Sequence, residues 1–141
     1  MSAAFDMARL GEVFGNDVTH DADTGATVLT HAFGDEDFLK GHFPGFPVVP
    51  GVILLDGMIL AGLHAVSRRT GQANPPVCAI QVDQVMFNRP VRPGAPVAFA
   101  ARLGAPAPVT ADLEARASVM IDGVRHARCS LTFLSHGAVA P

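Results

Sequence analysis

The chain has 141 residues, of which 49% are hydrophobic and 16% charged, so a disordered polypeptide is excluded and a sizeable core is expected. The formal net charge is -3 and no basic stretch stands out, which argues against binding to nucleic acid. Two cysteines, Cys78 and Cys129, are too few for a disulfide framework and form no CxxC pair. We therefore expect both to be small core residues in a reducing compartment.

Neither the N-terminal segment nor the longest apolar run has the layout of a targeting or membrane segment. Residues 1–14 carry three charged residues among apolar ones and lack the basic-then-apolar order of a signal peptide. The longest apolar run, from Gly51 to Val66, is shorter than a membrane span and contains Asp56 and His64. We expect a single domain over residues 1–141, in the cytoplasm and without membrane contact.

Two strands are predicted first, over Val13–His20 and Ala26–Phe33, with a turn at Asp21–Gly25 between them. The acidic segment Gly34–Lys40 is expected to be a loop with about one helical turn. Three prolines in Gly41–Pro50 exclude a regular helix or a central strand there.

A long buried helix is predicted next. Pro50 suits the first helical turn, where its missing N–H is not needed. The run from Gly51 to Val66 is apolar on nearly every side, which is typical of a helix buried all round. Arg68 and Arg69 suit the last turn, and Gly71 can supply a left-handed cap.

Four more strands are predicted, with turns at Pro93-Gly94 and Asp122-Gly123, a short connector at Gly104–Val109 and a frayed tail at Ser135–Pro141. Their ranges are Val77–Phe87, Val97–Leu103, Val109–Met120 and Val124–Phe133. The chain is thus expected to form an α+β fold, with an antiparallel meander following one apolar helix. A curved sheet wrapped around the helix would bury it, and a second copy would cover the remaining apolar surface.

One segment, from Gly41 to Asp56, carries candidate acid–base chemistry and reads GHFPGFPVVPGVILLD. His42 lies in the stiffened loop, and an imidazole with a reference pKa of about 6.5 suits a general base. Asp56 is the single carboxylate of the apolar helix, where desolvation would raise its pKa and keep it protonated as an acid. Two alternatives stay open: a structural role for His42, and a buried salt bridge from Asp56 to an arginine.

This segment resembles the active-site signature of the hotdog-fold 3-hydroxyacyl-acyl-carrier-protein dehydratases of fatty acid synthesis. The later segment Phe87–Gly94, FNRPVRPG, resembles the strand and turn that follow in the same family. The order of elements agrees from about Val13 to Phe133. The resemblance implies a hotdog fold and a lyase that removes water from a 3-hydroxyacyl thioester on acyl carrier protein, giving an enoyl thioester.

The resemblance also implies roles for three residues. His42 matches the catalytic histidine and Asp56 the catalytic acid on the central helix, the two coming from opposite subunits of a dimer. The amide of Gly51 matches the group that binds the thioester carbonyl, a task that suits a helix N-terminus. No cofactor is implied, and the histidines lack the spacing of metal ligands.

The expected partners are acyl carrier protein and further copies of this chain, as a homodimer or higher oligomer. An acidic carrier protein needs a basic docking patch, although a solvated surface is an equally good interpretation of each candidate arginine. These candidates are Arg68, Arg69, Arg89 and Arg92.

Two features depart from the family pattern. One branch of the family uses glutamate where this chain has Asp56, and another branch, which includes enzymes that also isomerise the new double bond, uses aspartate. Leu60 stands where both branches usually carry glutamine. We therefore expect a divergent member, serving a specialised polyketide or aryl-lipid pathway. Three alternatives stay open: a hotdog thioesterase, a coenzyme-A-linked enoyl hydratase and a non-catalytic acyl-binding subunit. His64, two turns beyond Asp56, is expected to be a satisfied core or surface histidine, and the alternative is that it lines the same cavity as Asp56.

Overall fold

The computed structural model describes residues 7–34, 36, 39, 45, 47–75, 77–104 and 112–135. Two helices and six strands lie in this part of the chain. In chain order they are α1 Met7–Phe14, β1 Val18–His20, β2 Thr27–Ala32, α3 Gly51–Thr70, β3 Val77–Phe87, β4 Pro96–Leu103, β5 Leu113–Ile121 and β6 Val124–Ser135.

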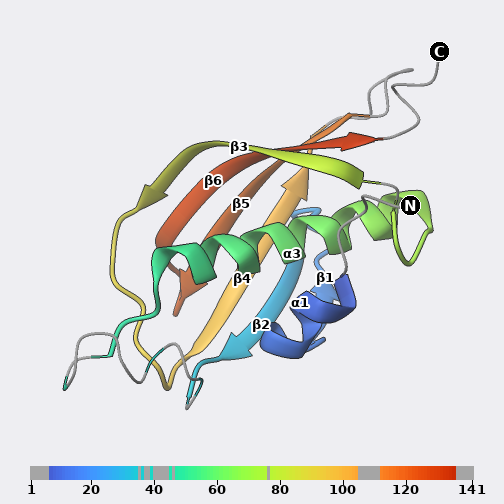
Figure 1. The fold of residues 1–141 in the computed structure, drawn as a ribbon. Coiled ribbons are helices and arrows are strands. Elements are labelled where there is room, and N and C mark those ends of the chain that lie inside the picture. The colour runs from blue at the N-terminus through green and yellow to red at the C-terminus, as the bar shows by residue number, and fades with distance from the viewer. Residues whose placement is uncertain are drawn as a thin grey trace.

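The six strands form one antiparallel sheet in the order β1-β2-β4-β5-β6-β3. Figure 1 shows the sheet curving around α3, which lies along its inner face. The alternation of buried and exposed residues in β4 and β5 places one face of each strand against the helix. The structure confirms the predicted α+β architecture, a curved antiparallel sheet around one long helix.

The central helix α3 begins and ends as the sequence predicts. Pro50 precedes its first residue, and Gly71 ends it with a φ of 73° and an N–H donated to the Ser67 carbonyl. By length and a mean hydropathy of 1.4, α3 could cross a membrane, but half of that stretch is buried inside the protein. Two glycines, Gly57 and Gly62, bring its backbone close to the aromatic rings of the sheet.

The first predicted strand is wrong over its first part, because Val13 and Phe14 belong to α1. Strand β1 is limited to Val18–His20. The ring of Phe14 is buried and packs edge-on against Phe33 and Phe99. This aromatic contact fixes α1 on the core, and it joins residues too distant in sequence for a local pattern to predict.

The expectation of a simple meander after the helix is also wrong. Strand β3 pairs with β6 at the edge of the sheet, and β4 pairs with β2 and β5. The connection over residues 88–95 contains Pro90 and Pro93, so it forms no tight hairpin and carries the chain to another part of the sheet. The Asp122-Gly123 turn is confirmed, since both residues have positive φ, 49° and 76°.

Some smaller predictions are settled by burial. Cys129 is buried and Cys78 half-buried, both as free thiols, and burial raises the pKa of the Cys129 thiol to about 11. Met58 is fully buried in the core, whereas Met86 is 47% exposed on β3. The predicted connector after Gly104 and the predicted tail after Ser135 lie outside the described residues.

Candidate acid–base site

Asp56 lies in the second turn of α3, on a half-buried side of the helix shared with Ile59. Burial alone raises the pKa of its carboxyl. Among the described residues, Asp56 forms no ion pair, since the single salt bridge there joins His31 to Glu36. The alternative of a buried salt bridge from Asp56 to an arginine therefore has no support in the described part of the chain.

Gly51, the other predicted site residue that the structure describes, is the first residue of α3. No side chain caps this helix end, so its first N–H groups point outward with the positive end of the helix dipole. A Cβ at Gly51 would lie 3.0 Å from Cζ of Phe87. Glycine is therefore favoured here by the close approach of an aromatic ring from β3.

His42 lies outside the described residues, but both ends of its loop can be placed. At one end, Gly94 donates its N–H to the Phe33 carbonyl, at 2.9 Å. At the other, Val49 donates its N–H to the Val91 carbonyl, at 2.8 Å. Both ends of the loop are thus fixed to the same β3–β4 connection.

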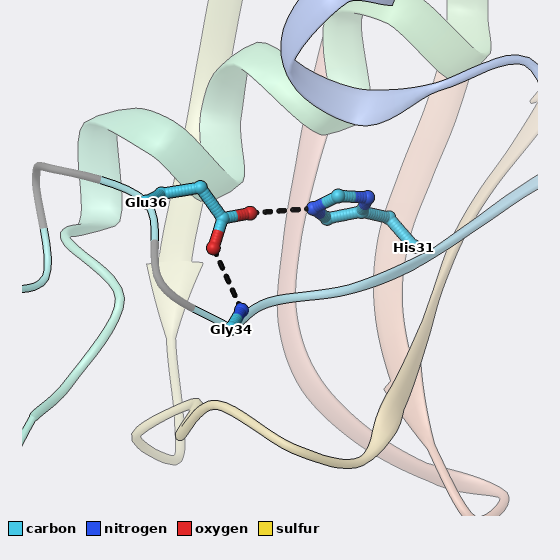
Figure 2. Close-up of polar contacts among 3 residues, drawn as sticks. All are labelled: His31, Gly34 and Glu36. Carbon is cyan, nitrogen blue, oxygen red and sulfur yellow. Dashed lines mark hydrogen bonds and ion pairs between the residues drawn. The ribbon is translucent and has the colours of Figure 1, made fainter.

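A carboxylate clamp reinforces the first end of this loop (Figure 2). Glu36 accepts one hydrogen bond from the Gly34 N–H at 2.7 Å, and its other oxygen lies 2.8 Å from Nε2 of His31. Burial raises the pKa of Glu36, but these hydrogen bonds outweigh burial and leave it below the ordinary value. The His31 ring packs edge-on against Phe14 and Phe33. Sequence reasoning missed this clamp, because nothing in the pattern distinguishes Glu36 from other loop acids.

Exposed apolar side chains gather next to the start of α3. Val52 is 63% exposed on the helix, and Phe87, whose ring approaches Gly51, is 50% exposed at the end of β3. Val85 and Met86 on the same edge strand are exposed too. Large exposed apolar side chains that gather in one region are typical of an interaction site. We call Val52, Val85, Met86 and Phe87 the apolar edge.

The four arginines considered for partner docking lie at two ends of the molecule. Arg89 and Arg92 belong to the connection that also holds Val91, the partner of Val49 just before α3. Arg68 and Arg69 lie in the last turn of α3, about 25 Å further along the helix axis at 1.5 Å per residue. The structure therefore does not bring the four together into one patch.

Leu60 and His64 follow Asp56 along α3. Leu60 is fully buried within the core, so the position expected to hold glutamine contributes packing here. His64 is half-buried and, among the described residues, its Nε2 is a buried nitrogen without a hydrogen-bond partner. The prediction of a satisfied histidine is wrong for this residue.

Solved structures similar to this chain define its class. A protein of the thioesterase superfamily superposes with a TM-score of 0.69 at 23% identity, covering 94% of each chain. At that identity the likeness establishes the fold alone. Together with the sheet around α3, it makes this protein a member of the hotdog fold class.

The family follows from sequence comparison. The family model described as ApeI-like, ApeI dehydratase, matches residues 18–119. The 3-hydroxyacyl-[acyl-carrier-protein] dehydratase FabZ of Thermus thermophilus is 33% identical over 105 residues, 74% of this chain and 72% of that protein. FabZ of Sinorhizobium medicae is 34% identical over 79 residues, 56% of this chain. The chain spans about half the length of that curated relative, 51%. It belongs to the ApeI-like dehydratase family.

Proposed function

We propose that this protein is a dehydratase that removes water from 3-hydroxyacyl thioesters carried by acyl carrier protein. Asp56 serves as the general acid, His42 as the general base, and the Gly51 amide as the group that holds the thioester oxygen. The family model and the FabZ relatives support this reaction class. The thioesterase-superfamily likeness supports the fold and favours no second reaction.

The half-buried Asp56 carboxyl is the observation that carries the proposal. A carboxylate on an apolar helix is costly to ionise when no cation or hydrogen-bond donor accompanies it. Burial raises the pKa of Asp56, and this favours the protonated form. A protonated carboxyl can give a proton to a departing hydroxyl, which an ionised aspartate in water cannot do.

The chemistry assigns one task to each group. His42 takes the proton from the carbon next to the thioester carbonyl, and negative charge develops on the carbonyl oxygen. The Gly51 N–H, at the positive end of α3, stabilises that charge. The C–O bond to the hydroxyl then breaks as Asp56 donates its proton, so that water leaves and a carbon–carbon double bond forms. A proton must return from the His42 imidazolium to the Asp56 carboxylate before the next turnover.

The apolar edge and the nearby arginines support two partners. A second copy covering the apolar edge would remove exposed apolar surface beside Gly51 and exclude water from the site. In that dimer, His42 of one subunit would face Asp56 of the other. Arg89 and Arg92, next to the start of α3, are the better placed candidates for docking an acidic carrier protein.

Single-turnover assays on a panel of 3-hydroxyacyl carrier proteins, with products weighed by mass spectrometry, test the proposal. Loss of one water is expected for the wild type. His42→Ala and Asp56→Asn should each lower the rate by about 10²–10⁴-fold, the usual contribution of a positioned acid or base. Asp122→Asn makes the same chemical change at the exposed β5–β6 turn and should leave the rate unchanged.

Other outcomes would contradict the proposal. Release of free thiol without enoyl product would identify a thioesterase. Turnover only of coenzyme-A substrates would identify a hydratase outside the carrier-protein pathway. Tight acyl-chain binding with no turnover on any substrate would identify an acyl-binding subunit. Wild-type rates in a folded His42→Ala or Asp56→Asn variant would remove that residue from the mechanism.

A further inference from the structure

A pocket lies at the opposite end of α3 from Asp56. It has a volume of about 260 Å³ and opens between the last turns of α3, the start of β2 and the end of β4. Its volume falls just below the range of about 300–1,000 Å³ that is usual for drug-sized ligands. The lining residues are Gly25, Thr27, Ala65, Arg68, Arg69 and Leu103.

The pocket is basic. Two of its described lining residues are arginines and none is acidic. Arg69 donates a hydrogen bond from Nη1 to the Gly104 carbonyl at 2.8 Å, which fixes its guanidinium at the rim. Neither arginine forms an ion pair within the described part of the chain, where the single salt bridge is His31–Glu36. Two unneutralised guanidinium groups beside a hollow form a site that suits an anion.

Two histidines, His20 and His64, lie near this end of α3. His20 pairs through Nδ1 with the hydroxyl of Thr27, a buried lining residue, at 2.9 Å. Burial and then the charge of Arg68 lower the pKa of His20, and burial and then His20 lower the pKa of His64. Arg68 therefore lies close enough to His20, and His20 to His64, to disfavour a positive charge on each histidine, and an anion bound beside Arg68 would oppose this effect on His20.

Arginines in the last turn of a helix also complement its dipole without binding any ligand. That role accounts for the presence of cations here but not for the hollow beside them. It also leaves unexplained the His64 Nε2, a buried nitrogen that lacks a partner among the described residues.

We propose that the pocket formed by Thr27, Arg68 and Arg69 binds a small anion that carries a phosphate or carboxylate group. The guanidinium of Arg68 binds the anion's oxygens, and the Thr27 hydroxyl offers a further polar contact. Arg69, fixed by its hydrogen bond to Gly104, adds positive charge at the edge of the pocket. Arg68 lies about 18 Å from Asp56 along the helix axis. The anion site is therefore separate from the dehydration chemistry and does not depend on it.

Calorimetric titration of the full chain with inorganic phosphate and, separately, with malonate tests this site and distinguishes the two chemistries. Saturable binding of at least one probe is expected. Arg68→Ala should weaken that binding by about tenfold or more, the usual worth of a charge-assisted hydrogen bond. Arg68→Lys keeps the charge but loses the bidentate geometry of the guanidinium. Its affinity for the probe should therefore lie between those of the wild type and Arg68→Ala.

Arg125→Ala is the matched control, because it removes an exposed arginine at the far β5–β6 hairpin. It should bind either probe as the wild type does. Amide NMR spectra should show shifts on phosphate or malonate addition at Gly25, Thr27 and Ala65. Absence of saturable binding for both probes, or equal losses in Arg68→Ala and Arg125→Ala, would overturn the proposal.

Discussion

Asp56 should make the folded protein less stable at neutral pH. Burial raises the pKa of Asp56 in the folded protein above the ordinary value of 3.8. At a pH between 3.8 and the folded-state pKa, the unfolded chain has therefore lost a proton that the folded chain keeps. Stability therefore falls as pH rises through this window, and the penalty is complete above the folded pKa. An acid kept ready for catalysis is in this way a cost to the fold.

We therefore expect Asp56→Asn to melt a few degrees higher than the wild type at neutral pH, although it has lost activity. The amide has the shape of the acid but cannot ionise. Below pH ~3.8, where Asp56 is protonated in both states, the two melting temperatures should converge. Calorimetric melting across this range checks the prediction, and a variant less stable than the wild type at neutral pH would contradict it.

Glu36 should have the opposite pH dependence. Its pKa is lowered from 4.5, so the clamp stabilises the fold above that value and loses this contribution as pH falls through the folded pKa. Glu36→Gln should lower the free energy of unfolding by about 0.5–1 kcal/mol at neutral pH, because the clamp is partly solvated. Urea unfolding should show that this difference in the free energy of unfolding becomes smaller in acid. Glu114→Gln, at an exposed position of β5, should have the same free energy of unfolding as the wild type.

At this scale, the sequence predicts residues whose chemistry conflicts with their surroundings. Asp56 can be recognised because a lone carboxylate interrupts an apolar helix, and its raised pKa agrees with that expectation. Glu36 and His64 cannot be recognised in the same way. The role of Glu36 depends on His31 across a turn, and the unpaired nitrogen of His64 depends on what packs around α3. Such contacts are absent from local patterns.

The packing of α3 against the sheet depends on its glycines. A Cβ at Gly62 would lie 2.5 Å from Cζ of Phe133, closer than atoms can pack, and 3.2 Å from Cδ1 of Leu131. Gly62→Ala gains about 1 kcal/mol of helix propensity but must displace buried side chains. Because overpacking costs about 1–3 kcal/mol, we expect a net loss of stability of up to about 2 kcal/mol.

Chemical denaturation of Gly62→Ala against Gly34→Ala measures this loss. Gly34 is exposed and no atom lies within 4 Å of a Cβ added there, so its variant should stay within about 0.5 kcal/mol of the wild type. A Gly62→Ala protein as stable as the wild type would mean that Phe133 moves freely and that the core is not closely packed at this point.

Elements with strong local signals could be predicted, and their pairing could not. The bounds of α3 follow from an apolar run that begins after Pro50 and ends at Gly71. The start of β3 follows from Pro76, which precedes it in the sequence. The placement of β3 beside β6 rests on contacts between residues distant in sequence, for which a meander is the simpler but incorrect expectation. Helix α1 has its buried residues Met7, Gly11 and Phe14 at helical spacing, a local signal that the predicted strand over Val13–His20 overlooks.

For the whole molecule, the proposed pairing of His42 with Asp56 across two subunits predicts an active site shared within a dimer. If His42 of one subunit serves Asp56 of the other, each dimer has two such pairs. A heterodimer of one His42→Ala subunit and one Asp56→Asn subunit then keeps one pair intact and has the other pair doubly disabled. Either variant alone forms homodimers in which both pairs are broken.

Mixing equal amounts of the two inactive variants, after mild dissociation and reassociation, should therefore restore about a quarter of the wild-type dehydration rate. Half of randomly paired dimers are heterodimers, and each has one of its two sites intact. If both groups acted within one subunit, mixing would restore nothing, because every subunit lacks one of them. Light scattering before and after reassociation confirms that dimers are present, and a mixture of Asp56→Asn with the double variant should stay inactive.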